Sequence, residues 1–293
     1  MRSKLFLTSL LVLSYLQSEM MGQDLWSILE SEPVDTPEYV MSTFKGNRLS
    51  IGHSIETRKK GALEVTFMSR YWNTAEESNN NFFADRMCAR FGVDYAFSDR
   101  FTAGVGYGPP NGIADGYVKY RFLQQGAGGD GSPVGITGLQ TATYRSRQLT
   151  GVEDRSEFFN RTAFTSQLLI ARKINTDFSL QVAPTFVHRS SSSNSLDDHN
   201  HFAVGFGGRY KLGNHVSLVS EYYYVANPLE SIETFGSFAL GVNWDVRYLL
   251  LQFTMTNNPI FTEDTFITQT RRNFNFKDGN FFFGFNATYF LQL

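Results

Sequence analysis

Residues 63–71 read Leu-Glu-Val-Thr-Phe-Met-Ser-Arg-Tyr, with mostly apolar side chains at the odd positions and mostly polar ones at the even positions. A period of two is typical of a β-strand that separates an apolar environment from a polar one. The alternation recurs along the chain and predicts about twelve strands, many near the roughly 9–11 residues that cross a bilayer when tilted. The other predicted strands lie at 87–97, 101–107, 117–122, 134–144, 162–170, 178–186, 202–212, 216–224, 238–246, 249–255 and 281–293.

The connections between these strands alternate in length. Short turns are predicted at 98–99, 172–177, 213–214 and around 245, and longer polar segments at 73–85, 145–157, 190–200, 226–234 and 256–280. Short turns at one end and long loops at the other are the topology of an outer-membrane barrel. Two connections fit less well, because 109–112 is short for an outer loop and 124–133 is long for a periplasmic turn. We predict an all-β fold, a closed antiparallel transmembrane β-barrel with both termini in the periplasm.

Aromatic residues form two rows on the apolar face. One row, beside the short turns, contains Phe97, Phe101, Phe122, Phe178, Tyr210 and Trp244; the other contains Tyr71, Tyr107, Tyr144, Phe158, Phe186, Tyr222 and Tyr224. Two such girdles flank the apolar band of a membrane barrel, whereas a soluble β-sandwich has no reason to place aromatics in rows. The last strand, 281–293, is apolar at every odd position and is suited to pair with the edge strand of a barrel-assembly machine.

The amino terminus predicts export. Arg2 and Lys4 precede an apolar run at 5–16, which is the pattern of a signal peptide, and we expect cleavage near Gly22. Residues 23–44 carry five acidic residues and no Lys or Arg, whereas 45–61 are basic. We interpret 1–22 as a signal peptide, 23–61 as a leader that lies in the periplasm or plugs the lumen, and 62–293 as the barrel.

Composition excludes several classes of function. The net charge of the 293-residue chain is -2, which lacks the basic profile of a nucleic-acid binder. Cys88 is the only cysteine, so the chain has no internal disulfide and no cysteine-rich metal site. We expect no cofactor. After residue 22 no apolar stretch approaches the roughly 18 residues of a membrane helix, so we expect strands to span a bacterial outer membrane and contact its lipid.

The chain resembles a functionally uncharacterised family of bacterial outer-membrane β-barrel proteins, which implies this fold and location but no activity or catalytic residues. The resembling stretches are Phe44-Lys45-Gly46 with Arg48, 52–61 (Gly-His-Ser-Ile-Glu-Thr-Arg-Lys-Lys-Gly), Gly92-Val93-Asp94-Tyr95, 168–173 (Leu-Leu-Ile-Ala-Arg-Lys), 184–189 (Pro-Thr-Phe-Val-His-Arg), 207–212 (Gly-Gly-Arg-Tyr-Lys-Leu) and Phe266-Ile267-Thr268.

If the side chains at the apolar positions of each strand face lipid, those at the alternate positions line the lumen. Its acidic members are Glu64, Asp94, Glu221 and Asp245, and its basic members are Arg70, Arg90, Lys119, Arg121, Arg161, Arg189, Arg209 and Lys211. The cationic excess favours binding or passage of a small anionic solute, and the strand directions predict that Arg70, Arg90, Arg161 and Arg189 converge across the bore. The alternative is a structural or complex-forming barrel whose lumen is filled by salt-bridged side chains or by the acidic leader at 24–38.

Two other groups of residues are candidates for a catalytic site and a metal site, and both are incomplete. His188 and Ser190 share a parity and could belong to a lipid-active esterase, but no orienting group or oxyanion hole is identifiable. The loop residues Asp197, Asp198, His199 and His201 could hold a divalent cation, although incidental loop histidines are commoner. We therefore assign no catalytic and no metal residues. Gly104, Gly106 and Gly108 lack the helix of a phosphate loop and are attributed to close packing in the wall, and Cys88 to filling of the wall.

Overall fold

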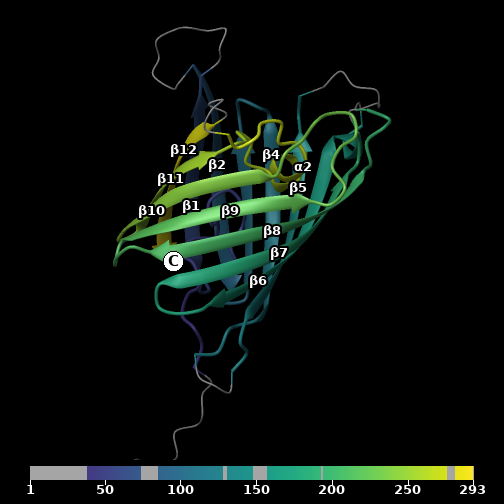
Figure 1. The fold of residues 1–293 in the computed structure, drawn as a ribbon. Coiled ribbons are helices and arrows are strands. Elements are labelled where there is room, and N and C mark those ends of the chain that lie inside the picture. The colour runs from purple at the N-terminus through teal and green to yellow at the C-terminus, as the bar shows by residue number, and fades with distance from the viewer. Residues whose placement is uncertain are drawn as a thin grey trace, which may run out of the picture. The chain divides into compact units, whose positions relative to one another are not determined.

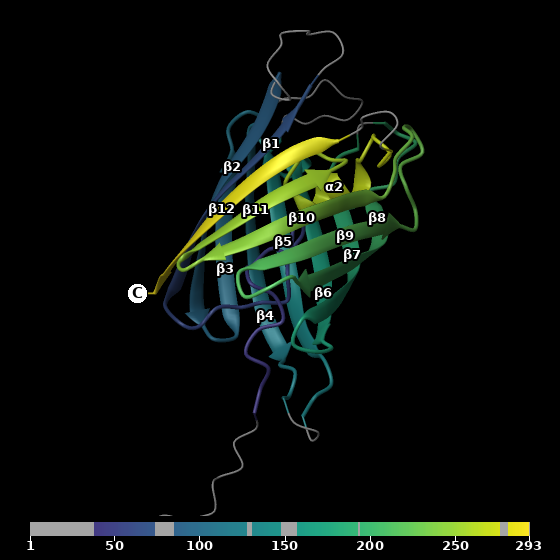
Figure 2. The ribbon, with the colours of Figure 1, turned by 60° about the vertical axis from the view of Figure 1, so that its left-hand side comes forward.

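A computed structural model of the chain describes residues 38–73, 85–127, 131–147, 157–192, 194–275 and 281–292. Twelve strands form a closed antiparallel barrel in which each strand pairs with the next along the chain and β12 pairs with β1 (Figures 1 and 2). The strands are β1 Ala62–Trp72, β2 Arg86–Ser98, β3 Phe101–Gly108, β4 Ile113–Leu123, β5 Gly135–Arg145, β6 Thr162–Lys173, β7 Phe178–Arg189, β8 Asn200–Lys211, β9 Val216–Val225, β10 Ser237–Val246, β11 Leu249–Thr256 and β12 Phe282–Gln292. The prediction of a closed twelve-stranded antiparallel barrel is confirmed.

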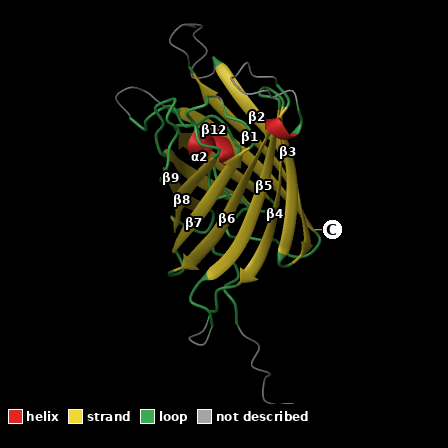
Figure 3. Cartoon of the chain, turned by 90° about the vertical axis from the view of Figure 1, so that its right-hand side faces the viewer, coloured by secondary structure: helices red, strands yellow, loops and turns green. Residues whose placement is uncertain are grey.

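The two ends of the barrel differ in their connections. At the turn end, two to four residues join β2 to β3, β6 to β7, β8 to β9 and β10 to β11. At the other end, which we call the loop end, the connections are longer, apart from the four residues 109–112 that join β3 to β4. They include a short 3-10 helix, η1 (Phe159–Arg161), before β6 and the helix α2 (Glu263–Thr268) between β11 and β12 (Figure 3). None of the helices in the described part of the chain is long and apolar enough to cross a membrane.

The side chains alternate between the two faces of the wall as the sequence predicts. Val93 and Leu180 on the outer face are 45% and 42% exposed, whereas Arg90 and Arg189 on the inner face are 3% and 7% exposed. The three wall glycines expected to reflect close packing have no single cause. Gly104 and Gly106 leave room for the inward side chains of Asp94 and Arg90, where an added Cβ would overlap them, whereas at Gly108 a Cβ would lie 3.1 Å from the Ala89 carbonyl oxygen.

The long connection at the turn end, 124–134, holds the chain at the point where it enters the barrel. The Val40 amide donates to the Gln125 carbonyl oxygen at 2.9 Å, the Gln124 side chain donates to the Val40 carbonyl oxygen at 3.1 Å, and Tyr39 forms an isolated bridge with Gly126. This contact explains why the connection is longer than the other turns. The acidic leader at 24–37 lies outside the described residues.

Candidate functional site

The lumen contains a compact segment of the chain itself, residues 42–57, which we call the lumen hairpin. Its trace lies inside the ring of strands in purple (Figures 1 and 2). Arg48 and His53 form an antiparallel bridge, the Ser54 amide donates to the Asn47 carbonyl oxygen, and the Leu49 amide donates to the Gly52 carbonyl oxygen, the last two at 2.9 Å. The apolar side chains of Phe44, Leu49 and Ile55 pack against Leu139 and Leu169 of the wall. A hairpin therefore forms the core of the barrel.

The wall binds this hairpin largely through its main chain. At the tip, one carboxylate oxygen of Glu221 on β9 accepts hydrogen bonds from the amides of Ser50, Ile51 and Gly52 at 2.8, 2.6 and 3.2 Å. Lys119 on β4 donates to the carbonyl oxygens of Asn47 and Ser54 at 2.7 and 2.9 Å. Two more wall donors reach carbonyl oxygens at 2.8 Å, Gln181 that of His53 and Gln252 that of Leu49. Buried backbone groups are costly when unpaired, so these side chains hold the hairpin in one position.

Charged side chains secure the hairpin near the turn end. Lys45 forms an ion pair with Asp245 on β10, and Arg58, which directly follows the hairpin, forms one with Glu64 on β1. Glu56 accepts hydrogen bonds from the amides of Thr43 and Phe44 at 2.7 and 2.9 Å and lies 3.6 Å from Arg121. Three of the four acidic residues predicted to face the lumen, Glu64, Glu221 and Asp245, therefore bind the hairpin or the residue after it.

The helix α2 closes the lumen at the loop end, and all six of its residues are buried. Glu263 accepts from Arg48 of the hairpin at 2.9 Å, and the neighbouring Asp264 forms an ion pair with Arg145 at the end of β5. Phe266 packs edge-on against Tyr223, with ring centroids 5.2 Å apart, in a cluster that includes Ile51 of the hairpin. Burial raises the pKa of Asp264, but the charges of Arg145 and Arg189 outweigh it, so this pKa lies below its usual value and the carboxylate is ionised at neutral pH.

The eight predicted lumen cations do not form one group. Arg90 pairs with Asp115 at 2.5 Å, Arg70 donates to Asn286 at 2.9 Å, and Lys119 binds the hairpin. Arg121 and Arg209 donate to the Thr57 carbonyl oxygen and the Ser217 hydroxyl, and Lys211 is half-buried near the turn end. Of the four arginines expected to converge, Arg161 and Arg189 line a common pocket, and Arg70 and Arg90 are not among the residues that line it. Arg161 belongs to η1 and not to a strand, and Arg70 and Arg90 are held by the wall.

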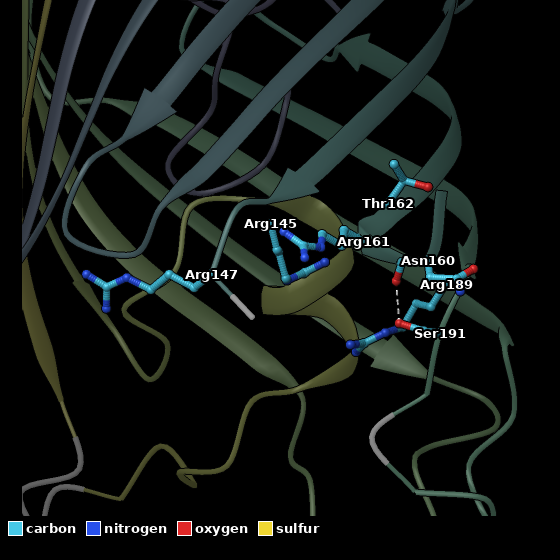
Figure 4. A pocket seen from close by; sticks show the side chains of 7 residues that line it. All are labelled: Arg145, Arg147, Asn160, Arg161, Thr162, Arg189 and Ser191. Carbon is cyan, nitrogen blue, oxygen red and sulfur yellow. Dashed lines mark hydrogen bonds between the residues drawn. The ribbon is translucent and has the colours of Figure 1, made fainter. Parts of the chain in front are cut away.

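That pocket lies at the loop end and is lined by four arginines, Arg145, Arg147, Arg161 and Arg189, together with Asn160, Thr162 and Ser191. We call it the arginine pocket. Figure 4 shows Arg145 and Arg161 close together, with Arg147 pointing away from them at the rim, and the Ser191 hydroxyl donates to the Asn160 carbonyl oxygen at 2.6 Å. The pocket spans about 300 Å³ including space open to solvent, yet the free space between its side chains is about that of one water molecule. Guanidinium groups gathered in this way are the usual ligands of carboxylate and phosphate groups.

The other candidate residues have different partners. The His188 ring lies 2.8 Å from the side-chain amide oxygen of Asn200, and the Ser190 hydroxyl lies 3.1 Å from the Thr162 hydroxyl. His188 and Ser190 therefore do not form a catalytic pair. Asp197 accepts hydrogen bonds from Ser231, while His199 and His201 each contact a carbonyl oxygen. Among the described residues no group of three or more His, Cys, Asp or Glu side chains is arranged to hold a metal ion.

Sequence reasoning assigned residues 23–61 to the periplasm or the lumen without predicting a hairpin at 42–57, and it missed α2 and two pocket arginines, Arg145 and Arg147. The acidic pair Glu263–Asp264, which follows Thr262 and precedes the apolar Phe266-Ile267 within a long polar connection, was the one available signal for a buried helix. The hairpin has no regular apolar period to detect, because its buried apolar residues Phe44, Leu49, Ile51 and Ile55 are irregularly spaced.

Comparison with known proteins identifies the family. Residues 44–291 match the family described as a membrane bound beta barrel domain (DUF5777). Solved structures with a similar fold include a KdgM porin, at 7% identity and a TM-score of 0.49 over 77% of this chain and 98% of that chain. A NanC porin matches at 9% identity and a TM-score of 0.49 over 78% and 99%, and OmpT of Vibrio cholerae at 15% identity and a TM-score of 0.37 over 78% and 77%. No curated protein matches the sequence. The chain belongs to the family of membrane bound beta barrel domains, DUF5777, and is a β-barrel protein of the bacterial outer membrane.

Proposed function

We propose that this porin-like barrel binds a small anionic solute at the arginine pocket and passes it through a cationic lumen when the lumen hairpin moves. The observation that carries the proposal is the pocket itself, where four arginines gather at the loop end. Each guanidinium presents donors in a fixed fork, which suits a carboxylate or a phosphate and does not suit a cation. With both termini in the periplasm, the loop end faces the outside of the cell and the pocket meets arriving solute first.

Passage requires the hairpin to leave its seat, because residues 43–57 fill the lumen with buried side chains and buried hydrogen bonds. In the described part of the chain, the residues before the hairpin contact the connection at 124–126, and the barrel closes strand to strand without the hairpin, so the hairpin can move without breaking the wall. The strands pair with one another all round the barrel and do not depend on the hairpin for their backbone hydrogen bonds.

The second candidate is a structural barrel with a permanently filled lumen. It is favoured by the contacts that seat the hairpin, which include three amides on Glu221 and the ion pair of Arg48 with Glu263. A permanently filled lumen would carry no solute and would leave the arginine pocket without a role in permeation.

Single-channel conductance of the full chain in planar bilayers tests the proposal. We expect intermittent openings with anion preference, continuous conductance after deletion of residues 42–57, and reduced anion preference in an Arg145→Gln/Arg189→Gln variant. Arg100→Gln, which removes a charge from the exposed β2–β3 turn, is the matched control. A full chain that never conducts, while the deletion variant does, would establish the permanently filled barrel, and openings without anion preference would remove the role of the pocket.

A further inference from the structure

Resting on the function proposed above, we infer that the solute carries an oxyanion group, a carboxylate or a phosphate, which displaces Asp264 from Arg145 and thereby unlatches α2 and the lumen hairpin. The helix α2 would then be a latch between the arginine pocket and the lumen hairpin. Asp264 would act as an internal substitute for the solute.

The first step of the argument is the position of α2. Two consecutive residues of this helix reach two different parts of the molecule: Glu263 binds Arg48 of the hairpin, and Asp264 binds Arg145 of the pocket. Both carboxylates are almost fully buried, with side chains 2% and 1% exposed. Because the residues are adjacent on a six-residue helix, Asp264 cannot move far unless Glu263 moves with it.

The second step is the chemistry of the contact with Arg145. One terminal nitrogen of this guanidinium serves both a carboxylate oxygen of Asp264 and the Thr265 hydroxyl, the latter at 2.6 Å. The other carboxylate oxygen of Asp264 is buried with no hydrogen-bond partner among the described residues. The pair therefore lacks the two parallel bonds that make arginine–carboxylate contacts strong. An oxyanion that also reaches Arg161 and Arg189 competes with the Ser146 carbonyl oxygen and the Thr268 hydroxyl, which these arginines contact at 3.1 and 3.4 Å, and offers a charged acceptor in place of a neutral one.

The third step is space. The free space in the arginine pocket is about that of one water molecule, so a solute cannot be added beside the existing contacts. A phosphate or carboxylate therefore enters only if the lining side chains give up existing contacts. For Arg145 that contact is its ion pair with Asp264, a group of the same charge and similar shape, so an oxyanion on Arg145 competes with Asp264.

The last step connects α2 to the hairpin. Movement of α2 removes Glu263 from Arg48 and Phe266 from the cluster that contains Tyr223 and Ile51. The hairpin then retains its contacts with the wall but loses the contacts with α2 that cover it at the loop end. Because coupling between two binding equilibria is reciprocal, loss of the hairpin must tighten binding of the oxyanion by the same factor as the oxyanion loosens the hairpin.

The test uses the folded full chain with two readouts. Calorimetry measures binding of inorganic phosphate and, separately, of acetate, with chloride as a control anion. A thiol assay measures release of the hairpin: in a Cys88→Ser background, Ser50→Cys places a thiol at a hairpin position that is 0% exposed, where the native hydroxyl has no partner among the described residues. A water-soluble maleimide reaches this thiol only when the hairpin leaves its seat.

We expect phosphate or acetate to bind and to accelerate labelling. Asp264→Asn removes the competing charge, so it should tighten binding about tenfold or more and accelerate labelling without ligand. Deletion of residues 42–57 should tighten binding by the factor by which ligand accelerates labelling. The control Asp99→Asn, an equal charge change in the exposed β2–β3 turn, should change neither readout by more than about twofold.

The outcomes separate this inference from the proposed function. Oxyanion binding that Arg145→Gln weakens, with unchanged labelling, would overturn the latch and leave the binding site in place. Absence of phosphate and acetate binding in both the full chain and Asp264→Asn would overturn the binding site as well. Binding of one probe and not the other, with accelerated labelling, would support the latch and identify its ligand as a phosphate or a carboxylate.

Discussion

The contact of Glu221 with the tip of the hairpin yields a quantitative prediction. Replacing Glu221 with Gln keeps the size and the acceptor oxygen but removes the charge that three amides share. Hydrogen bonds to charged groups contribute about 1.5–3 kcal/mol each and neutral ones about 0.5–1.5 kcal/mol, so three bonds lose roughly 3 kcal/mol together. A neutral glutamine costs less to bury than a carboxylate, and this difference offsets part of the loss. The net loss for the seated hairpin is about 1–3 kcal/mol, or roughly 5- to 150-fold in its equilibrium.

The thiol assay at position 50 measures this directly, since the labelling rate follows the unseated fraction when seating is fast. We expect Glu221→Gln to accelerate labelling by that factor while the barrel keeps its heat-modifiable migration on gels. The control is Asp115→Asn, because Asp115 is a buried wall carboxylate that pairs with Arg90 of the wall. Labelling within twofold of the parent in a folded Glu221→Gln variant would refute the assignment of Glu221 as the main anchor of the tip.

Three further predictions follow from the wall and the lumen. Burial, together with the positive charges of Arg48, Lys119 and Arg90, holds the pKa of His53 well below its usual value of about 6.5. The carboxylate of Glu263, 3.5 Å away, opposes this shift. The hairpin in its lumen position therefore binds fewer protons than the released hairpin. Its stability should be intact above pH 6.5 and decline as the pH falls below that, so thiol labelling, normalised to the unfolded chain at each pH, should accelerate towards pH 5 and lose this dependence in His53→Gln. Val93→Arg places a charge on the lipid face and should cost about 2–4 kcal/mol in refolding into vesicles, whereas Val93→Leu should be nearly neutral; equal effects of the two would contradict the assigned facing. Gly106→Ala puts a methyl group where the Arg90 guanidinium lies, so it should disturb the pair with Asp115 and lower stability by about 1–3 kcal/mol, while Gly213→Ala, in open space, should not.

The wall was predictable because lipid and lumen impose opposite demands on neighbouring residues. In 63–71 the even-numbered residues are buried inside the barrel, and the odd-numbered ones, apart from the buried Ser69, are half-buried or exposed on its outer face, so the alternation in the sequence is largely the alternation in the structure. The same logic correctly placed Arg70, Arg90, Lys119, Arg189 and Arg209 on the inner face, where all five are buried.

The alternation of side chains along a strand could not show which inward groups pair with one another. Asp115 was not among the expected inward acids, yet it neutralises Arg90, and Arg161 lies in η1, where strand parity does not apply. The hairpin was hidden for a different reason: Lys119, Gln181 and Glu221 bind its carbonyl oxygens and amides, and every residue type presents those groups. The pocket arginines Arg145 and Arg147 follow the end of a predicted strand, so they were assigned to a loop.

Recognition through the backbone has a consequence for which positions tolerate substitution. Glu221, Lys119, Gln181 and Gln252 bind backbone atoms of the hairpin, so these four contacts do not depend on which side chains the hairpin carries. Substitution in the hairpin is limited instead by the packing of Phe44, Leu49 and Ile55 in the core and by Gly52, where any Cβ would overlap the Tyr223 hydroxyl. In a saturation library, the least replaceable residues should therefore include polar wall residues on strands far apart in the sequence as well as the buried apolar residues of the hairpin.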